Sequence, residues 1–338
     1  MTEKEAMFWR KEGSLIVCEL CNHKCKIANG KRGICGVREH IDGKLYSCVY
    51  GKTTGAHADP IEKKPLYHFY PGSFVYSLGT IGCNFRCKQC QNYEISQRLI
   101  DEKYLLTIDE ESVVSSAKDA GCKGLAWTYN EPTVWYEFTL NTSKIAKKEG
   151  LYTVYVTNGY IAEEPLKTLA PYLDAMNIDV KGFSEDFYKN IEGARLGPVL
   201  ETCILAYKLG IHIELTYLII PTLNDSEEMF QKFATWVKEK LSVDTVVHFS
   251  RFHPDYKLLD LPPTPYETMN KAYKIAKDTG IKYVYLGNLS SDKENTFCPK
   301  CGKCIIERRG FHSKWINAKD CVCSCGEKIP IVKTCKKL

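Results

Sequence analysis

Between residues 74 and 287 the chain alternates short apolar runs with longer segments of helical periodicity, and this alternation restricts the possible folds more than any other feature. The apolar runs that predict strands lie at 74–80, 124–129, 152–157, 175–180, 212–220, 245–250 and 283–287. The segments that predict helices lie at 109–121, 133–150, 163–173, 196–208, 226–239 and 266–280. Strands that alternate with helices pair in parallel through right-handed crossovers. The pattern therefore predicts an α/β fold, either a full or partial (β/α) barrel or an open doubly wound sheet.

Six of the predicted strands end in short polar segments. These segments are GCNFRC (82–87), YNEP (129–132), TNG (157–159), DVK (179–181), PTLND (221–225) and RFHPD (251–255). In barrels and in open parallel sheets alike, ligands bind at the carboxyl ends of the strands. We therefore expect the functional site to lie where these segments meet. For His248, Arg251, His253 and Asp255 two alternatives remain open, a substrate-facing polar group or an ordinary capped loop.

The loop after the first predicted strand carries three cysteines, Cys83, Cys87 and Cys90, and no fourth. A structural zinc site takes four protein ligands, and so does an ordinary iron–sulfur cluster. Three thiolates on one tight loop can hold three irons of a cubane cluster and leave the fourth iron open to a small chelating ligand. The alternative is a zinc site that a histidine such as His57 or His68 completes.

Cysteine is unusually frequent, with 17 residues among 338, and most of the cysteines lie in closely spaced groups. The start of the chain has no secretory signal pattern, so we expect a cytoplasmic protein in which such groups bind metal rather than form disulfides. A group of four thiolates precedes the barrel: Cys18, Cys21, Cys25 and Cys35. Its spacing favours a zinc knuckle and an additional, electron-relaying iron–sulfur cluster equally.

A third group lies near the end of the chain, and its spacing is typical of a zinc-ribbon or rubredoxin-like knuckle. We predict that its metal ligands, for zinc or iron, are Cys298, Cys301, Cys323 and Cys325. Cys321 is an alternative to Cys323, and Cys304 is left over. We favour zinc, because the segment is too small to fold without a bound metal.

These features divide the chain into three regions. Residues 1–72 are predicted to form an irregular, cysteine-rich metal-binding region, 73–290 the barrel, and 291–338 the C-terminal knuckle. The knuckle carries eleven Lys and Arg against five Asp and Glu. This surplus would suit an acidic partner or nucleic acid, or would offset the charge of the thiolates. No apolar run has the length of a membrane-spanning helix, so we expect no membrane partner.

The three-cysteine loop resembles the motif of the radical S-adenosylmethionine (radical SAM) superfamily, including an aromatic residue, Phe85, between the first two cysteines. The resemblance implies a partial barrel and a [4Fe–4S] cluster on Cys83, Cys87 and Cys90. It also implies that SAM chelates the open iron through its amino and carboxylate groups. An electron from the reduced cluster then cleaves SAM into methionine and a 5′-deoxyadenosyl radical, which abstracts hydrogen from a substrate.

Further segments resemble the SAM site of the superfamily, and chiefly that of the pyruvate formate-lyase activating enzymes. The segment around Glu131 stands where a Gly-Gly-Glu-Pro segment runs in the superfamily, although both glycines are replaced here. The resemblance implies SAM contacts for Glu131, Asn158, Asp179 and Lys181. Asp179 is expected to bind the ribose and Lys181 the carboxylate of SAM. Val156 stands where those enzymes have an aspartate before Thr-Asn-Gly.

Over most of its length the chain resembles the radical SAM protein of the AmmeMemoRadiSam system. The matching segments include CELCNHKCKIANGKRGICGVR, DPIEKKPLYHF, GTIGCNFRCKQCQNYEISQ, TYNEPTVWYE, HFSRFHPDYK and CPKCGKCIIERRG. The resemblance implies an oxidoreductase that activates or modifies a protein partner, with electrons from a ferredoxin- or flavodoxin-type reductant. Two alternatives remain open: radical modification of RNA, gripped by the basic knuckle, or of a small molecule; and a binding scaffold in which every cysteine group holds structural zinc.

Overall fold

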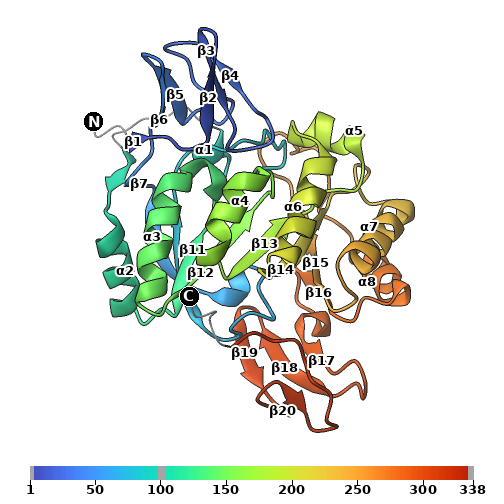
Figure 1. The fold of residues 1–338 in the computed structure, drawn as a ribbon. Coiled ribbons are helices and arrows are strands. Elements are labelled where there is room, and N and C mark those ends of the chain that lie inside the picture. Colours follow the sequence, from blue (N-terminus) through green and yellow to red (C-terminus); the bar gives the residue numbers. More distant parts are fainter. Residues whose placement is uncertain (1–3, 98–103, 334–338) are drawn as a thin grey trace.

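The computed structural model describes residues 4–97 and 104–333, and one eight-stranded sheet forms its centre (Figure 1). The strands of this sheet are, in spatial order, β16 (Val284–Gly287), β15 (Val246–Arg251), β14 (His212–Ile219), β13 (Ala175–Asp179), β12 (Tyr152–Thr157), β11 (Gly124–Trp127), β9 (Phe74–Gly79) and β8 (Gly55–Pro60). All neighbours from β9 to β16 are parallel, and β8 is antiparallel to β9. Among the described residues β8 and β16 do not pair with each other, so the barrel is partial, as predicted.

Helices cover the outside of this sheet. They are α2 (Glu110–Asp119), α3 (Tyr136–Lys148), α4 (Glu163–Leu169), α6 (Leu196–Lys208), α7 (Glu227–Lys240) and α8 (Tyr266–Thr279). The strand order follows the chain order without a reversal, so right-handed crossovers place these helices on one face, where Figure 1 shows α3, α4 and α6 side by side. Local signals agree with this layout: the Asp109 side chain caps α2 by accepting a hydrogen bond from the backbone of Ser112 at 2.8 Å.

The N-terminal region differs from the irregular structure that we predicted. It contains two small antiparallel sheets, β1 (Lys4–Glu5) with β6 (Lys44–Ser47) and β5 (Arg38–Ile41), and β2 (Trp9–Glu12) with β3 (Leu15–Cys18) and β4 (Lys26–Ile27). A further pair joins β7 (Lys52–Thr53) to β10 (Leu106–Thr107). Strands of two to four residues that alternate charged with apolar side chains are too short to give a recognisable period. Strand β8 was missed because it ends in Pro60, which an edge strand tolerates.

The C-terminal knuckle lies at the end of the barrel opposite to the N-terminal sheets (Figure 1). Its strands are β17 (Thr296–Phe297), β18 (Cys304–Arg309), β19 (His312–Trp315), β20 (Ala318–Lys319) and β21 (Val322–Cys323). A separate apolar core joins it to the first residues of β15 and β16, and its members include Val246, Tyr285, Ile305, Ile306 and Ile329. The knuckle therefore covers the amino ends of the strands. The last five residues of the predicted knuckle region, 334–338, lie outside the described residues.

Within 4–97 and 104–333, no helix has both the length and the apolar character that crossing a membrane requires.

Candidate active site and metal centres

The three-cysteine loop lies at the carboxyl end of β9, and two neighbouring segments hold it there. The Asn130 side chain accepts a hydrogen bond from the backbone N–H of Thr80 at 3.1 Å and donates one to the Gly82 carbonyl at 2.8 Å. From the other side, the backbone N–H of Arg86 donates to the Glu192 carbonyl at 2.8 Å. Hydrogen bonds to the backbone of the loop thus hold it in place without a cofactor.

The thiols of this loop are spaced for a cluster rather than for a single ion. Cys83 and Cys87 are buried and Cys90 is half-buried. Their sulfur atoms do not all lie within 4.8 Å of one another, as ligands of one tetrahedral ion would. Burial raises the pKa of Cys83 to about 12 and that of Cys87 well above its usual value. Buried thiols of this kind ionise only with a bound cation, and three of them fit three irons of a cubane with one iron left open.

Asn158, at the end of β12, contacts the cysteine loop directly. Its Nδ2 donates a hydrogen bond to Asn84 Oδ1 at 2.8 Å and lies 3.8 Å from Cys83 Sγ. Its Oδ1 accepts from the backbone N–H of Tyr160 at 3.0 Å. The side chain therefore links the TNG segment to the first cysteine, and its contact with SAM stays a prediction.

Glu131 is buried, and other protein groups already occupy its carboxylate. Oε1 accepts from the Thr133 backbone at 3.0 Å and from the Thr157 hydroxyl at 2.7 Å, and Oε2 accepts from the Asn158 backbone at 2.8 Å. In this arrangement Glu131 ties the end of β11 to the end of β12. The side chain positions the site, and its predicted contact with SAM has no support from these hydrogen bonds.

Asp179 and Lys181, at the end of β13, form an ion pair with 2.7 Å between Oδ2 and Nζ. Burial alone would lower the pKa of Lys181, but the nearby acidic groups, first the Asp179 carboxylate and then Cys87 and Glu192, raise it well above its usual value. The ammonium group is therefore charged and close enough to the cysteine loop to feel its charge. The positive charge of Lys181 would attract an anionic ligand to the iron that has no protein ligand.

Glu192 and Gln89 belong to the site although the sequence did not single them out. Gln89 Nε2 donates to Glu192 Oε1 at 2.5 Å, both side chains are buried, and burial raises the pKa of Glu192. Glu192 ends a π-helical turn, Tyr188–Glu192, which follows α5 (Glu185–Phe187). Such turns are frequent at functional sites but have no sequence period that would reveal them.

The polar residues of HFSRFHPDYK do not form one group. His248 lies inside the sheet, where its Nε2 is 2.7 Å from Glu214 Oε2. Two others reach the cysteine loop: His253 Nε2 lies 3.2 Å from Gln91 Nε2, and the backbone N–H of Lys257 donates to the Lys88 carbonyl at 2.9 Å. The alternative zinc site is not supported either: His68 bonds the Tyr285 hydroxyl at 2.6 Å, and among the described residues neither His57 nor His68 belongs to a group of ligand atoms close enough to hold one ion.

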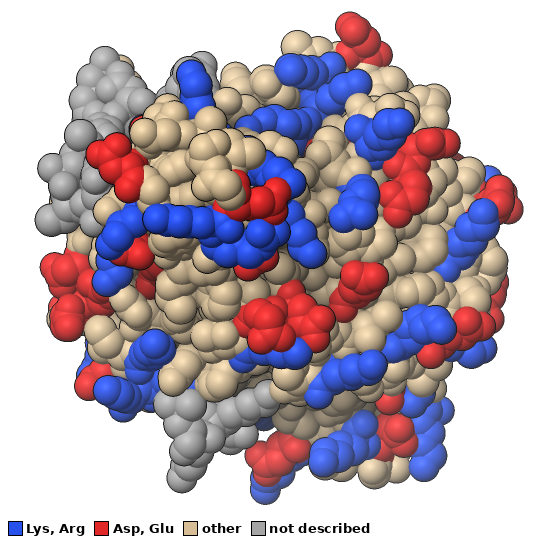
Figure 2. All heavy atoms as spheres, turned by 45° about the horizontal axis from the view of Figure 1, so that its top comes forward, with Lys and Arg blue, Asp and Glu red and all other residues tan. Residues whose placement is uncertain are grey.

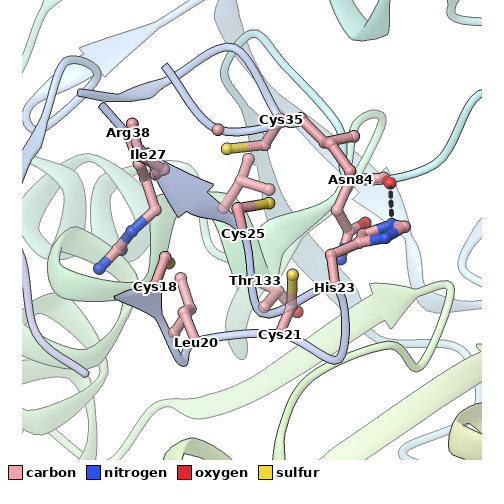
Figure 3. A pocket seen from close by; sticks show the side chains of 13 residues that line it. Cys18, Leu20, Cys21, His23, Cys25, Ile27, Cys35, Arg38, Asn84 and Thr133 are labelled. Atoms are coloured by element: carbon pink, nitrogen blue, oxygen red, sulfur yellow. Dashed lines mark hydrogen bonds between the residues drawn. The ribbon is translucent and has the colours of Figure 1, made fainter. Parts of the chain in front are cut away.

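The four N-terminal cysteines come together at one pocket, between the small sheets and the barrel. Cys18, Cys21, Cys25 and Cys35 all line it, together with Asn84 of the three-cysteine loop. Figure 3 shows the four side chains around one space, with Cys21 Sγ directed into it from below. The structure thus brings the predicted set together and also places it beside the active-site loop.

The four predicted knuckle cysteines also come together, and more tightly. All four sulfur atoms lie within 4.8 Å of one another, with 3.6 Å between Cys298 and Cys325 and 3.6 Å between Cys301 and Cys323. A hydrogen bond from the Cys325 backbone lowers the pKa of Cys323 to about 7. Cys321 lies apart and points its thiol at the Ile331 carbonyl, 3.7 Å away. The group can hold one metal ion, and it contains Cys323 rather than Cys321.

Comparisons with known proteins agree with this geometry. The model of the radical SAM superfamily matches residues 78–234. An uncharacterized protein of Methanocaldococcus jannaschii is 50% identical over 335 residues, which are 97% of this chain and 99% of that protein. The pyruvate formate-lyase-activating enzyme of Clostridium pasteurianum is 26% identical over 213 residues, 58% of this chain and 87% of that enzyme.

Among solved structures, the crystal structure of SuiB from Streptococcus suis matches with a TM-score of 0.50 at 12% identity, over 65% of this chain and 48% of that chain. At this identity the match supports the fold alone. The family model, the relative of equal length and the three-cysteine loop at a barrel strand end agree with one another. The chain belongs to the radical SAM superfamily.

Proposed function

We propose that this chain uses SAM, at a [4Fe–4S] cluster held by Cys83, Cys87 and Cys90, to activate or modify a protein partner. The observation that carries the proposal is the loop itself: three thiols, two of them buried, that are too far apart for a single ion and would leave one iron of a cubane without a protein ligand. When bound, the cluster supplies the electron that cleaves the sulfonium of SAM to start radical chemistry. The protein's part is to bind, orient and shield SAM.

The side chains around the loop have distinct roles in this proposal. Lys181 binds the SAM carboxylate, because its ammonium group is half-buried, charged and directed by Asp179. Asn158 fixes the loop through Asn84. Glu131 holds two strand ends in register, so that the backbone of the YNEP segment faces the site.

A protein partner is favoured by two observations. The similarity to a pyruvate formate-lyase-activating enzyme extends over 87% of that enzyme. In addition, the N-terminal sheets flank the carboxyl ends of the strands, where they enlarge the surface around the site for a macromolecular partner (Figure 1). The partner proteins of the AmmeMemoRadiSam system are the first candidates, and a ferredoxin or flavodoxin is the proposed reductant.

The first experiment measures 5′-deoxyadenosine. The protein is reconstituted with iron and sulfide without oxygen, reduced, given SAM, and analysed by mass spectrometry beside Cys83→Ala. We expect product from the wild type alone. Cell extract is then added after protease or after ribonuclease treatment: stimulation that protease abolishes and ribonuclease spares supports a protein substrate. Stimulation that only ribonuclease abolishes contradicts it.

Radical modification of RNA, with the knuckle as a clamp, is the alternative. The knuckle lies at the opposite end of the barrel from the cysteine loop, which favours the protein substrate over this alternative (Figure 1). Its exposed lysines Lys300, Lys314 and Lys319 allow a direct test. If RNA binds there, K300E/K314E/K319E removes a salt-dependent RNA affinity. For the four knuckle cysteines we propose zinc, since their 3.6 Å sulfur pairs fit a single tetrahedral ion.

A further inference from the structure

The N-terminal pocket takes its cysteines from the β3–β4 connection and from the loop before β5. Cys18 ends β3, Cys21 lies in the turn that follows, Cys25 directly precedes β4, and Cys35 lies in the loop before β5. The turn is also fixed to the barrel, because Cys21 forms a β-bridge with Ile161, just after the TNG segment. All four thiols are free, and none forms a disulfide. The chain thus holds four thiols around one space without joining them to each other.

The spacing of these thiols separates a cluster from a single ion. In the part of the chain that the structure describes, only the knuckle brings three or more ligand atoms within 4.8 Å of one another. The N-terminal thiols are therefore spread more widely, like those of Cys83, Cys87 and Cys90. A cubane needs such a spread, because each thiolate binds a different iron, whereas four thiolates around zinc all approach one centre.

The walls of the pocket hold polar atoms that lack a partner. Arg38 Nε and Asn84 Nδ2 are buried without a hydrogen bond, and both residues line the pocket. A buried donor without an acceptor is costly, and native proteins rarely keep one. The sulfides of an iron–sulfur cluster are acceptors that a zinc ion would not bring. The guanidinium of Arg38 is buried beside the thiols and forms an ion pair with Glu137 at 2.8 Å, so it is held in place there.

The pocket and the active-site loop are in direct contact. His23 Nε2 donates a hydrogen bond to the Asn84 carbonyl at 2.7 Å, and Arg86 donates to the carbonyl of Ile34, next to Cys35. Asn84 lines the pocket and also accepts the hydrogen bond from Asn158. One residue therefore touches both cysteine sets.

We propose that Cys18, Cys21, Cys25 and Cys35 bind a second [4Fe–4S] cluster, which passes single electrons to the cluster on the three-cysteine loop. Four thiolates saturate the cluster, so it has no open iron for substrate, and electron transfer is the role that remains. In each transfer the N-terminal cluster goes from the 1+ to the 2+ state, and the loop cluster goes from 2+ to 1+. A low-potential one-electron protein, of ferredoxin or flavodoxin type, then reduces the N-terminal cluster again. The electron relay depends on the proposed function, whereas the binding of a second cluster by the N-terminal cysteines does not.

The surface around the pocket suits an acidic electron donor. Lys24, Lys31, Arg86 and Lys88 are exposed on the N-terminal region and on the cysteine loop. Figure 2 shows Lys and Arg side chains on the face of the molecule that carries this end, with Asp and Glu side chains among them. Complementary charge of this kind speeds the encounter between redox proteins.

The metal site is tested without SAM, in the variant Cys83→Ala/Cys87→Ala/Cys90→Ala. After reconstitution we expect about four iron and about four sulfide per chain, and an electron paramagnetic resonance signal of a reduced [4Fe–4S] cluster. Adding Cys18→Ala and Cys25→Ala together should remove both, because two thiolates cannot hold a cubane, whereas adding Cys48→Ala, a half-buried thiol that does not line the pocket, should keep them. Two zinc ions per chain without iron would mean that the N-terminal cysteines bind zinc, and no metal beyond that of the knuckle would mean that they bind none. Either result overturns the proposed cluster. Because no SAM chemistry is involved, this result is independent of the proposed function.

The relay is tested with the loop intact, in Cys18→Ala/Cys25→Ala. We expect dithionite, a small reductant, to reduce the loop cluster as in the wild type, and reduced flavodoxin to do so at least about tenfold more slowly. About four iron per chain on the loop verifies that the variant is folded. Cys48→Ala should behave as the wild type with both reductants. Equal rates with flavodoxin in the double variant and the wild type overturn the relay and leave the metal site standing.

Discussion

Gly82 and Cys35 are in such close contact that a Cβ atom on Gly82 would stand 2.7 Å from the Cys35 carbonyl oxygen and 2.6 Å from Cγ1 of Val37. Gly82 also has a φ of +87°, in the left-handed region that other residues avoid. The residue directly before the first active-site cysteine is thus fixed against the loop that carries the last N-terminal cysteine. Only glycine satisfies both the space and the backbone.

Gly82→Ala should therefore lower the free energy of unfolding by about 2–4 kcal/mol, because strain and overpacking add. Gly121→Ala is the matched control: its φ is +69°, but nothing lies within 4 Å of its Cβ position. The control should lose only about 1 kcal/mol. Denaturant unfolding of the anaerobic protein measures both. Equal losses would mean that the contact with Cys35 contributes nothing.

Arg308 should be the main anchor of the knuckle. It is buried, donates to the carbonyls of Tyr67 at 2.8 Å and Glu294 at 3.0 Å, and lies over the Tyr67 ring at 4.1 Å. Arg308→Ala should cost about 3 kcal/mol and make the knuckle sensitive to limited proteolysis, and Arg308→Lys should not restore it. The exposed neighbour Arg309 is the control, and its alanine variant should stay within about 0.5 kcal/mol. Equal protease resistance of both alanine variants would contradict this role.

His68 should make stability depend on pH. Burial lowers the pKa of His68 to about 3 in the folded protein, against 6.5 for a free histidine. The ring is therefore neutral when folded, and below about pH 6.5 only the unfolded chain takes up the proton. Stability is intact above that pH and falls by up to about 1.4 kcal/mol per unit as pH decreases toward 3.

Urea unfolding between pH 7.5 and 5.5 tests this prediction. The curve of unfolding free energy against pH should be flatter for His68→Gln than for the wild type. His312→Gln, at an exposed position, should leave the slope unchanged. The same slope in all three proteins would show that His68 is not the titrating group.

Lys181→Met should weaken SAM binding by about 10- to 100-fold, because a charge-assisted hydrogen bond to the SAM carboxylate is lost. Equilibrium binding to the reconstituted, oxidised protein measures this without turnover. The exposed Lys189→Met is the control. Iron content must be measured in parallel, since Lys181 also stabilises the charges of Cys87 and Glu192. Unchanged affinity with a full cluster would remove Lys181 from the SAM site.

The barrel was predictable from the sequence because parallel strands buried on both faces give unbroken apolar runs. The run 152–157 became β12 with the predicted bounds, and the run 74–80 became β9 with one residue fewer. The rule that strand ends meet at one edge placed Asn158 next to Cys83, and the structure brings the two together. The fold and the neighbourhood of the site thus followed from local patterns.

Contacts that depend on the direction in which a side chain points could not be predicted from local sequence patterns. In HFSRFHPDYK no local pattern indicates that His248 points into the sheet toward Glu214 while His253 contacts the cysteine loop. Glu192 reaches the cysteine loop from a π-helical turn about a hundred residues away in the chain. Such pairings come from tertiary packing, which composition and periodicity do not encode.

The shared wall between the two cysteine sets also bears on how the protein is assembled and damaged. The three-cysteine loop contacts the surroundings of the N-terminal cysteines through Gly82, Asn84 and Arg86. Neither region can therefore shift without moving the other. Oxygen that strips iron from one centre would loosen the loop around its neighbour. Damage at one centre should therefore speed the loss of metal from the other, although each can load alone, and the distant knuckle should be unaffected.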